Sequence, residues 1–317
     1  MIMQGKLKVG VFGVGSLGQH HARIYADMEE ADLVGIVDTD PGRAAEIAAR
    51  HGTRVFESPE ALATEIEAAS IVIPTDRHHE LARTLITHGV HMLVEKPIAS
   101  GMREAETMVQ LAEEKDLILQ VGHVERFNPV MQFLEDTLGR PRFIEAIRLG
   151  KYPPPRPGAP PRGTEVSVVL DLMIHDLDII LHLVRSPVRE IHAVGVPVLS
   201  PTEDIANVRL AFENGCVANV TASRISQEQM RKIRVFQEDS YVSLDYMNQA
   251  GRVHRKTAEG ISVEPVPIEK GEPLAAELAS FVDCVANRAD PIVSGRHGAS
   301  ALKLAVDICR TVRENPS

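Results

Sequence analysis

Tryptophan is absent from this chain of 317 residues, aromatic residues make up only 4% of it, and cysteine occurs three times. Cys216, Cys284 and Cys309 lie far apart and form no CxxC pair, so the sequence offers neither a disulfide framework nor zinc spacing. We therefore expect reduced, mostly buried thiols. No apolar run reaches the roughly 18 to 20 residues that a membrane span needs, and the first residues lack the apolar stretch of a signal peptide. The sequence predicts a cytoplasmic protein with no membrane partner.

A basic excess is lacking as well. Lys and Arg number 34 against 44 Asp and Glu, which gives a formal net charge of −10. A surface that binds nucleic acid usually shows as a basic excess or a basic stripe, so we expect no nucleic-acid partner. The hydrophobic content of 44% is ordinary for a globular protein. The length favours two domains of roughly 100 to 200 residues each.

Residues 1–122 alternate short apolar runs with stretches of helical spacing, among them Arg43–Arg50, Glu80–Thr87 and Met102–Lys115. The predicted buried strands are Leu7–Phe12, Leu33–Val37, Ser70–Ile73, Met92–Val94 and Ile118–Val121. Alternation of this kind is typical of βαβ units. We predict an α/β protein whose N-terminal domain is a doubly wound, nucleotide-binding parallel sheet.

Residues 123–317 show a different pattern, in which predicted strands follow one another directly. These strands are Phe143–Leu149, Ile191–Val196, Val208–Phe212, Val217–Ala222, Ile233–Gln237 and Tyr241–Asp245. Glu213-Asn214-Gly215 predicts a hairpin turn between two of them, because Asn and Gly tolerate positive φ. Long helical patterns cover only Val168–Val184, Leu274–Ala286 and Gly298–Arg313. We predict a C-terminal α+β domain with a large, open, mostly antiparallel sheet, and its last helix is free to pack back on the first domain.

The helices of this second domain are too few to cover both faces of its sheet. Polar and apolar residues alternate along Val217–Ala222, so one sheet face is expected to meet another subunit. The sequence thus predicts a homodimer or homotetramer that assembles through the C-terminal sheet. The segment Tyr152–Arg162 carries six prolines in eleven residues and is predicted to be an exposed loop.

The motif Gly13-x-Gly15-x-x-Gly18 stands between the first strand and the helical stretch Gln19–Met28, which is the context that it needs. Gly13 allows a tight turn, Gly15 lets the backbone approach a pyrophosphate, and Gly18 lets helix and strand pack closely. The alternative is that the glycines serve only a turn. The predicted cofactor-binding loop comprises Gly13, Gly15, Ser16, Leu17 and Gly18.

Asp38 ends the second predicted strand, 20 residues beyond Gly18. A carboxylate there can accept hydrogen bonds from both adenosine ribose hydroxyls and would repel the 2′-phosphate of NADP. We therefore predict NAD rather than NADP as cofactor. Arg43 lies close enough in sequence to complicate this choice, and a role for Asp38 in solubility alone is the other reading.

Two further constellations have the residue types of a dehydrogenase site. Lys96, in Glu95-Lys96-Pro97, follows the fifth strand at the carboxyl edge where open α/β sheets bind ligands, although an exposed lysine without function fits this tripeptide equally well. Asp171 and His175 lie one helical turn apart, and a carboxylate beside an imidazole raises its basicity. A catalytic base, a solvated polar face and a metal site all fit this pair. No Cys cluster or HExxH motif accompanies it, so we expect no metal.

The segment His123–Pro129 follows the last strand of the first domain, and a change of domain commonly borders a cleft. Arg126 has the chemistry to hold an anionic substrate group, and an interdomain salt bridge explains it equally well. We include Arg126 and Asn128 among the predicted substrate-binding residues.

Taken in order, Gly13-x-Gly15-x-x-Gly18 with Asp38, Pro74-Thr75-x-x-His78, Glu95-Lys96-Pro97 and Asp171-x-x-x-His175 resemble the glucose-fructose oxidoreductase, inositol dehydrogenase and related (Gfo/Idh/MocA) family. The resemblance covers essentially the whole chain. It implies a Rossmann domain, an α/β domain whose open sheet packs against a partner subunit, and an active site in the cleft between the domains. It also implies reversible hydride transfer between the hydroxyl-bearing carbon of a sugar or cyclitol and a nicotinamide.

By matching position, the resemblance implies a role for each motif residue. Lys96 would bind and orient the substrate, His175 would accept the proton, and Asp171 would contact the substrate and tune His175. The residues that it assigns to the cofactor are Thr75, His78, Glu95 and Lys96.

The stretches His123–Pro129 and Asp171–Ile179 are similar to the branch of this family that oxidises nucleotide sugars such as UDP-N-acetylglucosamine at C3. In the proline-rich loop, Arg156 and Arg162 have the chemistry to reach a diphosphate, which a free sugar lacks. A dehydrogenase of free myo-inositol or aldose is the alternative enzyme. A non-catalytic NAD-binding sensor is a third reading, although it should lack one of the catalytic side chains.

Overall fold

The computed structural model describes residues 5–155 and 161–314. The chain forms two compact units. The first comprises the residues up to Val124 together with Glu272–Ala299, and the second comprises Glu125–Gly271 and the residues from Ser300 onward. The chain therefore returns to the first unit near its end, whereas the sequence pattern places the whole segment after residue 122 in the second domain.

The first unit is built on a six-stranded parallel sheet with the order β3-β2-β1-β4-β5-β6. Its strands are β1 (Leu7–Phe12), β2 (Ala31–Val37), β3 (Arg54–Val55), β4 (Ala68–Ile71), β5 (His91–Glu95) and β6 (Leu119–Gly122). Its helices are α1 (Gly18–Asp27), α2 (Pro41–His51), α3 (Pro59–Ala63), η1 (Thr75–Arg77), α4 (His78–Thr87), α5 (Met102–Glu114) and α8 (Pro273–Asn287). The strand order reverses between β1 and β4, and ligands of open α/β sheets bind at the carboxyl ends of the strands at such a point.

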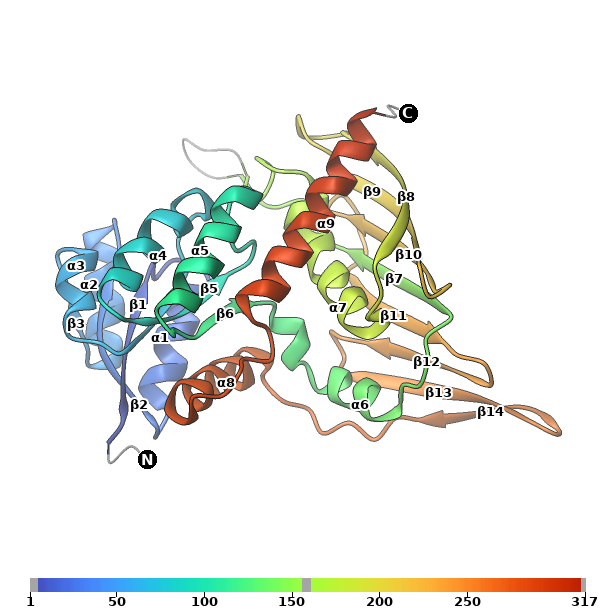
Figure 1. The fold of residues 1–317 in the computed structure, drawn as a ribbon, viewed down its shortest axis with the longest axis horizontal. Helices are drawn as coiled ribbons and strands as arrows, with labels where there is room; N and C mark the ends of the chain where they lie inside the picture. The colour runs from blue at the N-terminus through green and yellow to red at the C-terminus, as the bar shows by residue number, and fades with distance from the viewer. Residues whose placement is uncertain (1–4, 156–160, 315–317) are drawn as a thin grey trace. The chain divides into compact units, whose positions relative to one another are not determined.

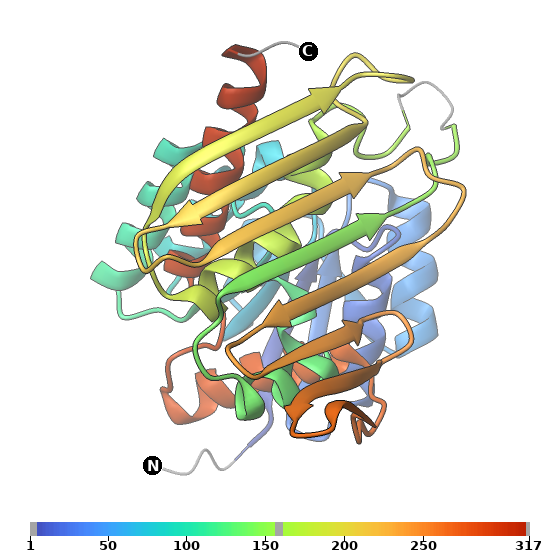
Figure 2. The same cartoon turned by 90° about the vertical axis from the view of Figure 1, so that its right-hand side faces the viewer.

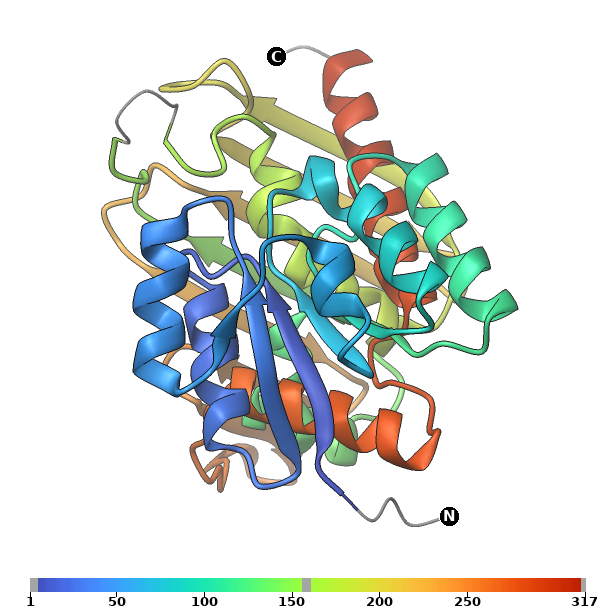
Figure 3. The same ribbon diagram turned by 90° about the vertical axis from the view of Figure 1, so that its left-hand side faces the viewer.

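Local chemistry explains where these elements begin and end. Asp40 caps α2 by accepting a hydrogen bond from the backbone N–H of Arg43, and Pro41 takes the first helical position. Gly52 ends the same helix with φ of +65°. Side chains of α1 and α8 share a buried cluster with the sheet, to which α8 contributes Leu278, Phe281, Val282 and Val285. Figure 3 shows the blue strands β1 and β2 of this sheet side by side.

The second unit is built on an eight-stranded sheet with the order β14-β13-β12-β11-β7-β10-β9-β8, in which only β7 and β10 pair in parallel. Its strands are β7 (Phe143–Leu149), β8 (Val188–Val196), β9 (Ile205–Phe212), β10 (Val217–Ser223), β11 (Met230–Phe236), β12 (Ser240–Asp245), β13 (Ala250–Thr257) and β14 (Gly260–Pro265). The other elements are η2 (Val124–Phe127), which starts at the junction, α6 (Pro129–Thr137), η3 (Val169–Met173), α7 (Ile174–Val184) and α9 (Gly295–Glu314), whose first residues belong to the first unit.

The helices of this unit cover one face of its sheet. Buried residues of α7 and α9 form one core cluster with the inward-facing residues of β7, β9 and β10 (Figure 1). Burial alternates strictly along β7, where Ile144, Ala146 and Arg148 face inward. The other face is turned to the viewer in Figure 2, and within the described part of this unit no helix lies over it.

The predicted fold class is confirmed, including the hairpin turn at Asn214 and Gly215, where Gly215 has φ of +87°. The three cysteines are buried free thiols, as expected. Three strands were missed. β3 has only two residues, β13 is mostly polar, and β14 alternates apolar and polar residues over only six positions, with Ile261 and Val263 exposed.

The helical pattern predicted over Val168–Val184 is helical along that range, but its first part is not α-helical. Val169–Met173 is a π-helical turn, and α7 begins at Ile174. Among the described helices, none combines the length and the apolar character that crossing a bilayer requires.

Candidate active site

Glycines shape the loop between β1 and α1. Gly13 has φ of +85°, and a Cβ at Gly18 would collide with the carbonyl carbon and oxygen of Gly13, so both positions require glycine. A Cβ at Gly15, by contrast, would meet no atom of the described residues within 4 Å. The backbone at Gly15 is therefore open on the side where a pyrophosphate would approach the start of α1.

The N-terminus of α1 is chemically suited to an anion. Ser16 is exposed, and Leu17, at the N-cap position, makes no side-chain capping bond. The first N–H groups of a helix have no partner within the helix, and the helix dipole favours negative charge there. The predicted loop residues thus form a cradle whose shape and polarity fit a dinucleotide phosphate.

Asp38 lies at the end of β2 and is fixed by the loop itself. One carboxylate oxygen accepts a hydrogen bond from the backbone N–H of Val14 at 2.7 Å, and the other accepts one from Asp40 at 2.9 Å. Each carboxylate oxygen can accept a second bond, which leaves acceptor capacity for ribose hydroxyls. Arg43 is held beside the same loop, since its Nε donates to the Val14 carbonyl at 3.1 Å and one Nη to Gln19 at 2.7 Å.

His78 joins two loops at the carboxyl end of the sheet. Its Nε2 lies 3.0 Å from the carbonyl oxygen of Ile73, and its Nδ1 lies 3.1 Å from that of Pro97. Burial lowers the pKa of His78, although these carbonyl contacts act in the opposite direction. His78 therefore ties the turn after Lys96 to the loop that carries Thr75, and Thr75 itself is half-buried.

Glu95 anchors the backbone of Lys96. The Glu95 side chain is buried at the end of β5, where one carboxylate oxygen accepts a hydrogen bond from the Lys96 N–H at 3.2 Å. The other oxygen lies 3.4 Å from Nε2 of His21, and Nδ1 of His21 lies 3.1 Å from the Ser70 hydroxyl. Lys96 is half-buried and directly follows Glu95 at this edge of the sheet.

Asp171 and His175 both belong to the second unit. Asp171 lies in the π-helical turn and His175 in the first turn of α7, and both are half-buried. The carbonyl oxygen of Ser167 accepts a hydrogen bond from the Asp171 N–H at 3.1 Å. The Ser167 hydroxyl accepts a hydrogen bond from the Val169 N–H at 3.2 Å. π-helical turns within α-helices are frequent at functional sites.

Arg126 and Asn128 have partners inside the second unit. The Arg126 side chain is 1% exposed and lies 3.5 Å from the Asp178 carboxylate. Asn128 is 4% exposed and donates to Glu125 and to the carbonyl oxygen of Tyr246. These contacts and the burial of both side chains favour structural anchoring. Their substrate role stays a prediction.

Of the two arginines of the proline-rich loop, Arg162 is exposed and Arg156 lies outside the described residues. No group of three or more His, Cys, Asp or Glu suited to a metal ion occurs in the described parts of the chain.

Two buried arginines near the Asp171–His175 helix, Arg148 and Arg224, form ion pairs that were missed from sequence. Arg148 binds Asp176 through Nε at 2.7 Å and Glu125 through Nη1 at 3.0 Å, which fixes the residue after His175. Arg224 binds Asp204 at 2.8 Å. The sequence signal for each arginine was its charge at an apolar strand. Arg148 occupies an inward position of β7, and Arg224 directly follows β10.

The arrangement supplies the parts of alcohol oxidation. The first unit holds a dinucleotide cradle and a lysine at the carboxyl edge of its sheet. The second holds a carboxylate and an imidazole four residues apart, and imidazole suits proton transfer near neutral pH.

Two family models match the chain. Residues 7–123 match "Oxidoreductase family, NAD-binding Rossmann fold" and residues 133–242 match "GFO/IDH/MocA C-terminal domain". The UDP-N-acetylglucosamine 3-dehydrogenase of Acidithiobacillus ferrooxidans is 36% identical over 95% of this chain and 96% of that protein. Its solved structure superposes with a TM-score of 0.91 over 98% of both chains.

Two other relatives are more distant. The scyllo-inositol 2-dehydrogenase (NAD(+)) of Bacillus subtilis is 25% identical over 98% of this chain and 95% of that protein. A levoglucosan dehydrogenase solved with NADH and levoglucosan is 20% identical, with a TM-score of 0.88 over 98% of both chains. That last likeness concerns the fold alone.

Proposed function

The chain belongs to the Gfo/Idh/MocA family of oxidoreductases, and from that premise we propose that it oxidises the C3 hydroxyl of UDP-N-acetylglucosamine or a close nucleotide sugar, with NAD as hydride acceptor. The observation that carries the proposal is the identity of 36% to a UDP-N-acetylglucosamine 3-dehydrogenase along nearly the whole chain. Lys96, Asp171 and His175 are all present, which argues against a non-catalytic NAD-binding sensor.

The loop residues Gly13, Gly15, Ser16, Leu17 and Gly18 would hold the pyrophosphate, and Asp38 would bind the adenosine ribose. When bound, the nicotinamide supplies the carbon that accepts the hydride. Asp38 supports NAD over NADP because a 2′-phosphate would meet its negative charge.

Oxidation of a secondary alcohol to a ketone removes a hydride from carbon and a proton from oxygen. We assign the proton to His175, because an imidazole with an unperturbed pKa of about 6.5 accepts protons near neutral pH. Asp171 would stabilise the imidazolium that forms. Lys96, on the edge fixed by Glu95, would donate a hydrogen bond to the reacting oxygen and orient the substrate.

A dehydrogenase of free inositol is the second candidate, and the 25% identity to the scyllo-inositol enzyme over almost the whole chain favours it. The exposed guanidinium of Arg162 supports the nucleotide sugar, since a diphosphate gives it a partner that inositol lacks.

A substrate panel tests the proposal. The purified protein is incubated with NAD or NADP and each of UDP-N-acetylglucosamine, other UDP-sugars, free N-acetylglucosamine, myo-inositol, scyllo-inositol and aldoses, and the absorbance of the reduced nicotinamide is followed. We expect kcat/KM for UDP-N-acetylglucosamine to exceed that for every free sugar and cyclitol by about tenfold or more. Preference for an inositol would favour the second candidate.

We also propose that the open face of the second unit's sheet is buried between copies of the chain. A row of four rings in contact crosses that face from β7 to β13. The Phe143–Phe236 pair is tilted, with a centroid distance of 5.6 Å, whereas Phe236–Tyr241 at 4.8 Å and Tyr241–His254 at 4.0 Å are stacked. Aromatic rows on an uncovered face mark interaction surfaces.

A further inference from the structure

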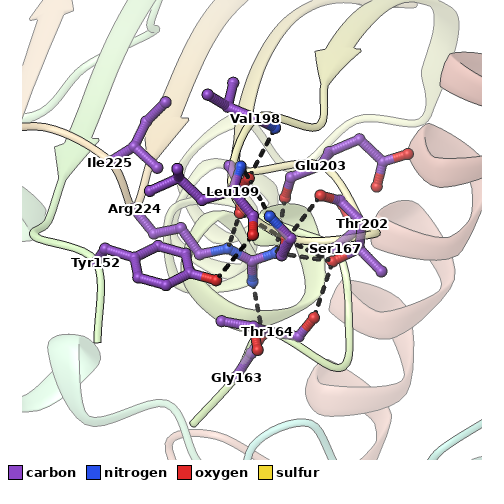
Figure 4. A network of polar contacts seen from close by, with 12 residues as sticks. Tyr152, Gly163, Thr164, Ser167, Val198, Leu199, Thr202, Glu203, Arg224 and Ile225 are labelled. Atoms are coloured by element: carbon purple, nitrogen blue, oxygen red, sulfur yellow. Dashed lines mark hydrogen bonds and ion pairs between the residues drawn. The ribbon is translucent and has the colours of Figure 1, made fainter. Parts of the chain in front are cut away.

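Arg224 follows β10 in the second unit and is buried, with a side chain that is 2% exposed. Its Nε donates to Asp204 at 2.8 Å, and its Nη2 donates to the Thr202 hydroxyl at 2.7 Å. Its Nη1 donates to the carbonyl oxygens of Gly163 at 2.6 Å and Val166 at 2.9 Å. Figure 4 shows this guanidinium at the centre of the network.

Asp204 makes the guanidinium a fixed point. Its side chain is fully buried, and one carboxylate oxygen accepts hydrogen bonds from the backbone N–H groups of Val198, Leu199 and Ser200. The other oxygen accepts from Arg224 and from the Ser200 hydroxyl at 2.6 Å. A carboxylate with this many donors has no freedom to move, so the direction of the Arg224 fork is set by the loop after β8.

The other end of the fork reaches the carbonyl oxygen of Gly163, and Gly163 lies against the Asp171 carboxylate. Gly163 has φ of +81°, and a Cβ on it would lie only 2.8 Å from Cγ of Asp171. The Gly163 backbone therefore packs directly against that carboxylate. Arg224 donates a hydrogen bond to the carbonyl oxygen of Gly163. Gly163 alone therefore lies between the Arg224 guanidinium and the Asp171 carboxylate, which we assign to catalysis.

The network also fixes the start of the helix. The Thr202 hydroxyl lies 2.8 Å from the Val166 carbonyl oxygen, and the Val168 N–H donates to the Glu203 carbonyl at 2.9 Å. Ser167, between these two points, accepts the hydrogen bond from the Asp171 N–H. All of these hydrogen bonds from Arg224 to Asp171 join residues of the second unit.

A buried ion pair seldom adds stability over well-packed apolar side chains of the same volume, because desolvation offsets the attraction. What it supplies is a unique geometry. Six contacts from one guanidinium to the segments 163–166 and 200–204 define that geometry here.

We propose that Arg224, oriented by Asp204, is a positioning residue that holds Gly163 against Asp171 and thereby sets the place of the Asp171 carboxylate beside His175. This inference rests on the proposed function, in which Asp171 stabilises the protonated imidazole. Displacing the carboxylate should lower both kcat and the pKa of His175.

A double-mutant cycle tests the proposal. Turnover of the best substrate is measured for the wild type, Arg224→Lys, Asp171→Asn and the double variant. We expect Arg224→Lys to lower kcat by about tenfold in the wild type and by less than about twofold when Asp171 is already Asn. The acid limb of the pH profile of kcat should move to lower pH in Arg224→Lys, and NADH affinity should stay unchanged. Arg140→Lys is the matched control, since the exposed Arg140 also donates to a backbone carbonyl.

Thr202 provides a milder pair of variants if Arg224→Lys does not fold. Thr202→Val removes the hydroxyl at constant shape and should reduce kcat by about threefold or more, whereas Thr202→Ser should retain it. Hydrogen–deuterium exchange of the segment 163–175 gives a readout without substrate, and it should accelerate in Thr202→Val and not in Thr202→Ser.

The outcomes separate the two proposals. If Asp171→Asn lowers kcat but Arg224→Lys costs the same factor in both backgrounds, only the positioning role is overturned. Unchanged exchange in the segment 163–175 overturns it as well. If Asp171→Asn turns over like the wild type, the catalytic assignment of Asp171 fails, and the positioning role fails with it.

Discussion

The carboxylate of Asp38 accepts a hydrogen bond from the backbone N–H of Val14 at 2.7 Å, so the acidic side chain after β2 is fixed to the glycine loop after β1. Replacing Asp38 with Ala removes the acceptor proposed for the ribose hydroxyls. We expect kcat/KM with NAD to fall much more than kcat/KM with NADP. The measurement is steady-state kinetics with both cofactors. A wild type that prefers NADP by about tenfold or more would refute the ribose argument.

Gly15 and Gly18 should respond differently to the same substitution. A Cβ at Gly15 meets no atom within 4 Å in the part of the chain that the structure describes, so Gly15→Ala should fold normally. It should bind NADH about tenfold more weakly, because the methyl group occupies the pyrophosphate's approach. A Cβ at Gly18 collides with the Gly13 backbone, so Gly18→Ala should lower Tm by about 5 °C or more. Thermal unfolding and NADH fluorescence titration measure both. Equal NADH affinity in Gly15→Ala and the wild type would mean that the pyrophosphate does not approach there.

Glu277 of α8 is fully buried, and within the described structure neither carboxylate oxygen has a hydrogen-bond partner. Burial, reinforced by the nearby Glu95, raises the pKa of Glu277 well above its usual value. The folded state therefore binds a proton that the unfolded state releases above about pH 4.5. At pH values between the pKa of Glu277 in the unfolded state and its raised pKa in the folded state, each added pH unit lowers the free energy of unfolding by up to about 1.4 kcal/mol.

Glu277→Gln abolishes that slope because the amide does not ionise. We expect the Tm of the variant relative to the wild type to be higher at pH 8 than at pH 5. Glu106→Gln, at an exposed position of α5, is the control and should follow the wild type at both pH values. A difference in Tm that does not change with pH would show that Glu277 keeps its charge state.

The row of four rings on the open sheet face predicts the assembly. Light scattering at micromolar concentration should give the mass of a dimer or tetramer for the wild type, and Phe236→Glu should reduce it, because a charge at the centre of the row opposes burial. The control Val55→Glu, at an exposed position of β3, should leave the mass unchanged. A monomeric wild type would contradict the proposal.

Elements with strong periodicity were predictable from sequence. β1 and β7 were placed at their observed bounds, because each is a short run with an unambiguous buried pattern. The glycine motif and Asp38 were found because their chemistry is local, within one βαβ unit. β13 and β14 were not found, since most of their side chains are exposed and their place is set by backbone pairing with β12 and with each other.

Contacts between distant segments were beyond the sequence analysis. The hydrogen bond from Arg224 to Gly163 joins residues that are 61 positions apart, and the sequence around either residue does not indicate the contact. Arg126 likewise has the chemistry of an anion-binding side chain in sequence, and only its burial against Asp178 reveals a partner. Propensity and periodicity report one element at a time, whereas such pairs depend on tertiary packing.

The most direct test of the account is the turnover of His175→Ala. Removing the imidazole should lower kcat by roughly 10² to 10⁴, the usual contribution of general acid–base catalysis, and leave NADH affinity nearly unchanged. The measurement is steady-state oxidation of UDP-N-acetylglucosamine between pH 6 and pH 9, with NADH binding followed in parallel by fluorescence. Turnover near that of the wild type across this pH range would contradict the account and transfer the proton to Lys96 or to a bound water.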